Sequence, residues 1–286
     1  MPRSIAIASV AAARALDEDL PPLLAALAEA GFEAEVCDWD DPSVDWSGFS
    51  AVLLRSTWDY TQRLPEFLAW CERVTAVTRL LNPLELVRWN CDKHYLRDLA
   101  ERGVPIVETC FIEPGESAED FPDYEEFVVK PAVSAGSRDT RRHLRAARSE
   151  AVAHVQGVLD QGRSVIVQPY LEAVDTAGET ALVHFDGVFS HAIRKGPLLQ
   201  RQSDATALLF ATEQIDPRTP TPAEHALAQQ VLAALPFPVP LYARIDLLPT
   251  LDGPRLLELE LIEPSLFFDH ADGSAARLAN QLIRLA

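Results

Sequence analysis

This chain of 286 residues has no long apolar run, no closely spaced cysteine pair and few lysines. The first two absences argue against particular classes of protein. No apolar run reaches the roughly 20 residues that a membrane-spanning helix needs, so a membrane protein is not expected. No CxxC pair occurs, which argues against a disulfide framework or a thiolate metal site. The four cysteines are therefore expected to be free thiols in a reducing cytoplasm: Cys37, Cys71, Cys91 and Cys110.

Positive charge is also in short supply. The chain has 25 basic and 43 acidic residues, which gives a formal net charge of −18. A field of that sign repels phosphate backbones and anionic lipid, so neither nucleic acid nor a membrane surface is an expected partner. An anionic ligand must then be held by a few placed cations or by metal ions. The length and the 48% apolar composition are typical of a globular protein with two or three domains.

Only three of the basic residues are lysine: Lys93, Lys130 and Lys195. Arginine serves as well at most solvated positions, so a remaining lysine marks a place where a compact ammonium on a slender stem is useful, as in holding phosphate. Chance explains any one of them equally well. All three fall within the motifs described below, which favours the functional interpretation.

The expected elements divide the chain into an α/β part and an α+β part. Strands alternate with helices as far as Asn82-Pro83, which is typical of a small parallel sheet. Asp-Gly turns at 186–187 and 252–253 then predict antiparallel hairpins. Strands are expected at 4–10, 32–37, 51–54, 106–112, 126–130, 164–168, 180–185, 188–194, 241–247 and 255–262. Helices are expected at 19–30, 63–77, 84–102, 149–159 and after Asp272.

Charged residues alternate along two strands that are expected to be neighbours. Side chains at i and i+2 share a face, so Arg244 and Asp246 point one way, and Glu258 and Glu260 point together from the next strand. If the hairpin turns near Asp252, the two pairs face each other across the ladder. Three carboxylates beside an arginine suit a hard cation such as Mg²⁺. A solvated strand face is the alternative.

A second motif is an apolar strand that ends at Lys130-Pro131 and continues into a run of small residues over 132–138. Such a loop lets backbone N–H groups approach oxyanions closely, while the lysine adds a point charge. A plain surface loop with an extended lysine is equally compatible with the pattern.

A third motif is the strand over 165–171, which runs into Pro169. Proline has no N–H, so pairing stops there and neighbouring backbone groups are left free to read a purine edge. Most such breaks are only strand ends.

A fourth motif, from Arg55 to Tyr60, lies just past the carboxyl end of an expected parallel strand. Ligands of open α/β sheets bind at that edge, and Arg55 with the nearby aromatic residues would hold a small carboxylate. A capping loop with Trp58 and Tyr60 partly buried is the alternative.

Taken in order, these segments resemble the ATP-grasp superfamily, and its glutathione-synthetase-like members in particular. The run from Glu258 to Pro264 resembles the superfamily's E-x-N metal motif, with Glu260 where asparagine is usual. The resemblance covers nearly the whole chain. It implies a small parallel α/β domain on the substrate side over 1–82, a central lid subdomain over 83–170, and a C-terminal subdomain with the metal site over 171–286.

A more specific similarity is to the O-ureidoserine cyclo-ligases of cycloserine biosynthesis and their relatives. It rests on Arg55-Ser-x-Trp-Asp-Tyr60, Arg88-Trp-Asn-x-x-Lys93, Lys130-Pro131, Gln168-Pro-Tyr-Leu171, Gly178-Glu179, His191-Ala-x-x-Lys195 and Glu258 to Pro264. The implied activity is ATP-dependent carboxylate–nitrogen ligation through an acyl-phosphate. Cyclisation to cycloserine and a dipeptide- or glutathione-type joining of two substrates both stay open.

The resemblance also implies roles for individual residues. ATP would contact Lys93, Lys130, Ser134, Gly136, Ser137, Gln168, Tyr170, Leu171 and Glu179. Two Mg²⁺ ions, with Mn²⁺ as a substitute, would be held by Asp246, Glu258 and Glu260, and the γ-phosphate would face the catalytic Arg244 and Lys195. A small amino-acid-like carboxylate is the expected substrate, with Arg55, Ser56, Tyr60 and His191 as its candidate contacts.

Two other classes of function compete with a ligase. A non-catalytic nucleotide-binding protein on the same fold is disfavoured because the lysines, Arg244 and the carboxylates are all intact. A metal-dependent hydrolase working without ATP is disfavoured because His184, His191 and His270 are scattered and no nucleophile–base motif is present. A cytoplasmic enzyme is expected, and assembly into a homo-oligomer stays open.

Overall fold

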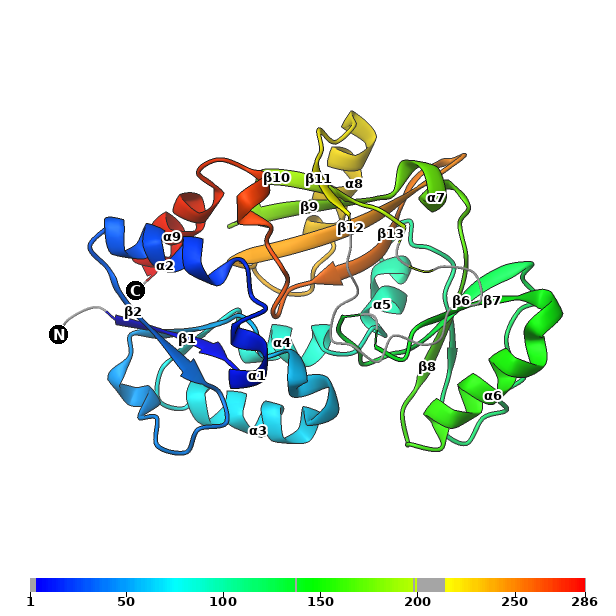
Figure 1. Cartoon of the computed structure of the whole chain (residues 1–286), viewed down its shortest axis with the longest axis horizontal. Coiled ribbons are helices and arrows are strands. Elements are labelled where there is room, and N and C mark those ends of the chain that lie inside the picture. Colours follow the sequence, from blue (N-terminus) through cyan, green and yellow to red (C-terminus); the bar gives the residue numbers. More distant parts are fainter. Residues whose placement is uncertain (1–3, 137, 198, 200–213, 286) are drawn as a thin grey trace.

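The computed structural model describes residues 4–136, 138–197, 199 and 214–285, and the strands in these residues form three sheets (Figure 1). The first sheet is parallel, with strand order β2-β1-β3-β4. Its strands are β1 (Ser4–Ser9), β2 (Glu33–Asp38), β3 (Ala51–Leu54) and β4 (Arg79–Leu81). The parallel α/β unit predicted from the sequence is confirmed, and β4 is a strand that the sequence pattern did not predict.

Both faces of this first sheet are covered by helices, because consecutive residues of β1 point to opposite sides. Ile5 and Ile7 join the cluster formed with α2 (Leu20–Glu29) and α9 (Ser274–Leu285). Ala6 and Ala8 instead join the cluster formed with α3 (Leu64–Thr75). The C-terminal helix therefore packs on the N-terminal sheet, beside α2 (Figure 1).

The second sheet is antiparallel, with strand order β5-β8-β6-β7. Its strands are β5 (Cys110–Ile112), β6 (Glu126–Pro131), β7 (Arg141–Leu144) and β8 (Val165–Pro169). Phe127 and Val129 pack against α6 (Arg148–Leu159), and the alternation of the strand turns Val128 and Lys130 to the other face. The strand expected over 106–112 is shorter, since only its last three residues pair as a strand.

The third sheet is antiparallel, with strand order β11-β10-β9-β12-β13. Its strands are β9 (Glu179–Phe185), β10 (Val188–Lys195), β11 (Ile215–Pro217), β12 (Tyr242–Thr250) and β13 (Gly253–Glu260). The predicted hairpin between β9 and β10 is confirmed, because Asp186 and Gly187 both have the positive φ that its two-residue turn requires. Helix α8 (Pro222–Ala233), which was not predicted, begins with a capping box between Thr221 and Glu224.

The single helix expected over 84–102 is wrong. Two helices form, α4 (Leu84–Asn90) and α5 (Tyr95–Glu101), and both pack on the five-stranded sheet. The Asp92 carboxylate accepts the His94 N–H at 3.0 Å, and the Lys93 N–H donates to the Ala132 carbonyl at 3.0 Å. The break therefore brings Lys93 beside the loop that follows β6.

The remaining helices are short: α1 (Ala11–Arg14), α7 (Ala173–Ala177) and 3₁₀ turns at Trp46–Gly48, Trp58–Gln62, Arg145–Ala147 and Phe268–His270. Within the residues that the structure describes, no helix is both long enough and apolar enough to cross a membrane. The three sheets surround a central space, with the N-terminal sheet at the lower left of Figure 1, β6 and β8 at the right and the five-stranded sheet above.

Candidate active site

A cavity of about 640 Å³ lies where the three sheets approach one another. Val128, Lys130 and Gln168 contribute to it from the second sheet, and strands of the third sheet contribute most of its charged lining. Of the site residues predicted from the sequence, those that line the cavity are Tyr60, Lys93, Lys130, Ser134, Gly136, Gln168, Tyr170, Leu171, Glu179, Lys195, Arg244, Glu258 and Glu260. Residues predicted from segments that are far apart in the sequence are thus brought to one space.

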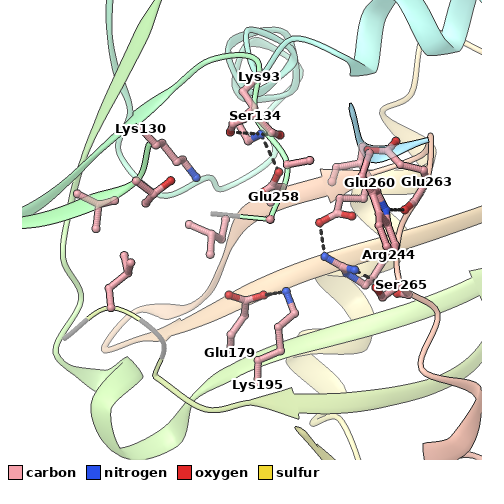
Figure 2. A pocket seen from close by; sticks show the side chains of 18 of the residues that line it. Lys93, Lys130, Ser134, Glu179, Lys195, Arg244, Glu258, Glu260, Glu263 and Ser265 are labelled. Atoms are coloured by element: carbon pink, nitrogen blue, oxygen red, sulfur yellow. Dashed lines mark hydrogen bonds and ion pairs between the residues drawn. The ribbon is translucent and has the colours of Figure 1, made fainter. Parts of the chain in front are cut away.

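Lys93 connects the two large walls of the cavity. Its Nζ lies 2.9 Å from Glu258 Oε1 on β13 and donates to the Ser134 carbonyl at 2.9 Å (Figure 2). It also lies 3.1 Å from the Ser134 hydroxyl. One ammonium therefore holds the small-residue loop after β6 close to the acidic edge of the third sheet.

Lys130 is the cation at the end of β6, and it is almost completely buried. Within the described part of the chain its ammonium makes no hydrogen bond or ion pair, and Figure 2 shows the side chain pointing into the cavity. Burial lowers the pKa of Lys130, and the nearby Lys93 lowers it further while Glu258 opposes the shift. A buried ammonium without a partner is a ready site for an anionic group of a ligand.

The hairpin of β12 and β13 sets the acidic residues opposite the basic ones. Arg244 pairs with Glu260 and Asp246 with Glu258 across the ladder, as the alternation of charges predicted. The tight turn alone would not produce this register. A β-bulge at Leu257 shifts the pairing by one residue, which turns Glu258 and Glu260 to the cavity while Leu256 and Leu259 stay in the core.

The carboxylates of this face are held in ion pairs. Asp246 accepts from Lys195 Nζ at 2.6 Å and from Arg244 Nε at 3.0 Å, and these cations keep the pKa of Asp246 far below its usual range despite burial. Lys195 also pairs with Glu179, and Arg244 pairs with Glu260. Figure 2 shows the last two pairs side by side.

Two carboxyl groups of this face titrate near neutrality. Burial raises the pKa of Glu179 to about 8 and that of Glu260 to about 7, because Lys195 and Arg244 do not fully offset desolvation and the neighbouring negative charges. Additional positive charge would therefore stabilise the ionised forms.

The carboxylate oxygens are suitable ligands for a divalent cation, but they are not arranged as a ready-made metal site. Oxygen ligands from Asp246, Glu258 and Glu260 are of the type that Mg²⁺ prefers, and the raised pKa of Glu260 indicates unmet demand for positive charge. In the described ranges, however, no three Asp, Glu, His or Cys side chains are close enough to hold a metal ion. Asp246 and Glu260 would have to release Lys195 and Arg244 in order to bind one.

The other wall of the cavity is formed by the end of β8 and the segment that follows it. Gln168 donates to the Thr109 hydroxyl at 2.9 Å, and the Tyr170 hydroxyl donates to Asp175 Oδ1 at 2.5 Å. The guanidinium of Arg142 lies 3.3 Å from the centre of the Tyr170 ring. Leu171 follows directly on the same edge, and Gly136, with a φ of +63°, belongs to the loop above. Ser137 lies outside the described residues.

Arg55 does not line the cavity. Its side chain is completely buried, lies 3.2 Å from Asp19 Oδ2 and 3.6 Å from Asp17 Oδ1, and donates to the Pro264 carbonyl at 2.8 Å. Two carboxylates already neutralise the guanidinium. The structure therefore does not support direct contact between Arg55 and a ligand, which differs from the sequence-based expectation.

Ser56 and His191 are also absent from the cavity lining. The Ser56 hydroxyl lies 2.7 Å from that of Ser9, and His191 Nε2 lies 2.7 Å from the Leu266 carbonyl. Both side chains are buried in the packing that surrounds the cavity. Of the four candidate substrate contacts, only Tyr60 reaches its wall.

The segment after β13 forms part of the wall that sequence reasoning missed. Asp19 accepts the N–H groups of Leu266 and Phe268 at 2.5 and 2.8 Å, and the Trp58 indole donates to the Glu263 carbonyl at 3.1 Å. Glu263, Ser265 and Phe267 face the cavity from this segment. Glu263 belongs to the acidic run after Glu258, and the proline that follows it was the available signal.

The chain is similar to known proteins in both sequence and fold. Residues 5–82 match the family model of the N-terminal domain of the D-cycloserine synthetase DcsG. The chain is 44% identical to the cycloserine biosynthesis protein DcsG of Streptomyces lavendulae, over 97% of each chain. The crystal structure of a D-cycloserine synthetase DcsG superimposes with a TM-score of 0.91, at 43% identity over 99% of this chain and 100% of that one.

More distant solved structures have the same fold. The D-alanine–D-alanine ligase of Bacillus anthracis superimposes with a TM-score of 0.70 at 14% identity, over 100% of this chain and 97% of that one. The ATP-grasp ligase PsnB, complexed with its minimal precursor, superimposes with a TM-score of 0.65 at 19% identity, over 100% of each chain.

Proposed function

This chain is an ATP-grasp ligase of the D-cycloserine synthetase family, and we propose that it cyclises O-ureidoserine to cycloserine through an acyl-phosphate. The observation that carries the proposal is the 44% identity to a cycloserine biosynthesis protein over 97% of both chains. The cavity supports it, because it combines buried cations suited to phosphate with a face of paired carboxylates.

We propose that ATP lies between the second and third sheets. Lys130 supplies the unpaired ammonium for the phosphates, and Lys93 joins it from the break between α4 and α5. The small-residue loop closes over the phosphates with Ser134, Gly136 and Ser137, the last of which lies outside the described residues. On the other wall, Gln168, Tyr170 and Leu171 meet the adenine, and Glu179 lies at the ribose.

Three chemical steps follow from this proposal. An oxygen of the substrate carboxylate attacks the γ-phosphorus of ATP, which gives an acyl-phosphate and ADP. The ureido nitrogen that is bonded to oxygen then attacks the acyl carbon, phosphate leaves and the nitrogen gives up its proton to water. Water finally removes the carbamoyl group from that nitrogen, which releases carbon dioxide and ammonia and leaves cycloserine. Arg244 and Lys195 neutralise negative charge on the transferred group, a role in which one cation is worth several kcal/mol. Because both cations are paired with carboxylates in the protein alone, they exchange partners when ATP is bound.

We further propose that Asp246, Glu258 and Glu260 hold two Mg²⁺ ions, for which Mn²⁺ substitutes. When bound, Mg²⁺ offsets the charge of phosphate oxygens and orients them. With the metal bound, Asp246 and Glu260 would be its ligands in place of partners for Lys195 and Arg244, and the added positive charge would favour the ionised form of Glu260. The need for ATP supports a cytoplasmic location, as do the four cysteines, all of which are free thiols.

The candidate substrate contacts differ in whether they face the cavity. Tyr60 faces the cavity and is the proposed direct contact. Arg55, Ser56 and His191 act indirectly, by fixing the segments that form the wall. The substrate is a small amino-acid-like carboxylate.

The test is to incubate the protein with ATP, Mg²⁺ and O-ureidoserine and to follow ADP release together with the organic product by mass spectrometry. We expect ADP and cycloserine in equal amounts. A dipeptide product from other amino acids, with no turnover of O-ureidoserine, would instead favour a two-substrate ligase. ATP binding without ADP formation from any amino acid would favour a non-catalytic protein.

A further inference from the structure

Glu263 is a buried acid that the proposed chemistry has not used. It is 8% exposed and lines the cavity from the segment after β13. Figure 2 shows it beside Glu260, on the same wall as Arg244. Trp58 holds its backbone carbonyl, and the Tyr60 hydroxyl forms a hydrogen bond with its carboxyl group. The carboxyl is thus held in place by two aromatic residues of the N-terminal domain.

Glu263 differs from the other buried carboxylates of the cavity because it has no cation. Among the residues that the structure describes, no lysine or arginine lies within ion-pair distance of it. Burial raises the pKa of Glu263 to about 8, and the charge of Glu260 adds to the shift. The cavity carboxylates that do have cations are Glu258 with Lys93, Glu260 with Arg244, and Glu179 with Lys195, while Asp246, which is buried outside the lining, pairs with Lys195 and Arg244.

Ionising a buried carboxyl group that has no cation nearby costs free energy, because the charge has lost its water. The site therefore favours a ligand that carries a positively charged group. An α-amino acid carries its ammonium group two bonds from its carboxylate carbon. Arg244 offers a cation and Glu263 a carboxyl group without one on the same wall of the cavity, so each charged group of an amino acid has a partner of the opposite kind there. Ser265 links the two, because its carbonyl accepts from Arg244 Nη1 at 3.1 Å two residues after Glu263.

We infer that Glu263 binds the α-ammonium group of the amino-acid substrate and makes the enzyme select substrates that carry one. This inference rests on the proposed function. Tyr60 orients the carboxyl group of Glu263. The carboxylate of the substrate lies toward Arg244 and the site of phosphoryl transfer. Glu263 is therefore a specificity-determining contact, distinct from the residues that hold ATP and metal.

The test compares two substrates in two proteins. The substrates are O-ureidoserine and its analogue with hydroxyl in place of the α-amino group, and the readout is the KM for each from ADP formation. In Glu263→Gln, which keeps the shape and an acceptor for Tyr60, we expect the KM for O-ureidoserine to rise by about 30-fold or more. The KM for the hydroxyl analogue should change little, so the variant loses most of the parent's preference for the amine.

Two controls separate this effect from general loss of charge and from loss of metal. Glu18→Gln removes an exposed carboxylate at the same cavity and should leave both KM values unchanged. The KM for ATP and the Mg²⁺ concentration for half-maximal rate should be unchanged in Glu263→Gln. An equal effect of the two variants, or a raised Mg²⁺ requirement, would overturn the inference.

Misfolding is checked by the melting temperature and by Glu263→Asp, which should recover part of the preference for the amine. Equal preference for the amine in the parent and in Glu263→Gln would overturn the assignment while leaving the ligase activity in place. Absence of ADP formation by the parent with O-ureidoserine and with every other amino acid would overturn the proposed function and, with it, this inference.

Discussion

Replacing Arg55 by alanine would leave two buried carboxylates without their cation. Asp17 and Asp19 are 1% and 7% exposed in their side chains, and Arg55 itself is 0% exposed. Removing one partner of a buried ion pair costs about 3–5 kcal/mol, because the remaining charge stays desolvated. The total free energy of unfolding of a domain is about 5–15 kcal/mol, so we expect a large part of the stability to be lost.

The loss should exceed that of a matched exposed arginine. Arg63 also lies in the N-terminal part and contacts Asp40, Asp59 and Glu66, but its side chain is 33% exposed. Solvent screens such pairs, so Arg63→Ala should cost about 1 kcal/mol or less. Urea unfolding followed by circular dichroism measures both differences on one scale, provided that the slope with urea concentration does not change.

Ligand affinities decide between a structural and a substrate-binding role for Arg55. If the buried network explains this residue, the affinities for ATP and for the amino-acid substrate should fall together, because Arg55 holds the Pro264 carbonyl in the wall of the cavity. The reasoning would be refuted if Arg55→Ala unfolded at the same urea concentration as Arg63→Ala while only the KM for the amino-acid substrate rose.

Three further predictions follow from charged and titratable side chains, two of them in the cavity and one outside it. Lys130→Met removes a buried ammonium that has no partner among the described residues, so the free energy of unfolding should rise by about 1 kcal/mol or more. The same variant should bind ATP much more weakly, as measured by calorimetry. Lys130→Arg should also weaken ATP binding, since a planar guanidinium does not fit a point-charge site. Glu258→Gln should lower ATP turnover by orders of magnitude with an unchanged circular dichroism spectrum, and near-normal turnover would contradict the metal assignment. Burial lowers the pKa of His184 to about 4, so between pH 6.5 and 4 the unfolded state binds more protons than the folded state. The free energy of unfolding should therefore fall as the pH falls through that window. In His184→Gln the midpoint of urea unfolding should depend less on pH over the same range.

The elements that were predicted correctly depend on local signals. Asp186-Gly187 specifies its hairpin because both residues adopt positive φ, and the alternation at Arg244 and Asp246 needs only the geometry of a strand. Lys130 was found for a similar reason, since it ends an apolar run and precedes a run of small residues. In each case the residues that determine the structure are close together in the sequence.

The features that were missed depend on distant contacts. The break after α4 is stabilised locally by the contact of Asp92 with the His94 N–H, and also by the bond from Lys93 to Ala132, about 40 residues away, which the helical pattern over 84–102 does not show. Arg55 is occupied by Asp19 and by the carbonyl of Pro264, more than 200 residues away. A sequence motif identifies such a residue as unusual but does not say whether it contacts a ligand or a neighbouring backbone.

The bulge at Leu257 limits how the hairpin of β12 and β13 could change during evolution. With the bulge in place, Leu256 and Leu259 lie in the core and Glu258 and Glu260 face the cavity. Loss of the bulge with Leu257 retained would continue the register of the turn, set Glu258 opposite Ile245 and put acidic side chains into the apolar layer beneath the sheet. Descendants of this chain are therefore free to lose the unpaired Leu257, or to lengthen or shorten the hairpin in steps of two residues, whereas a change by one elsewhere in β13 needs a second, compensating insertion or deletion in the same hairpin.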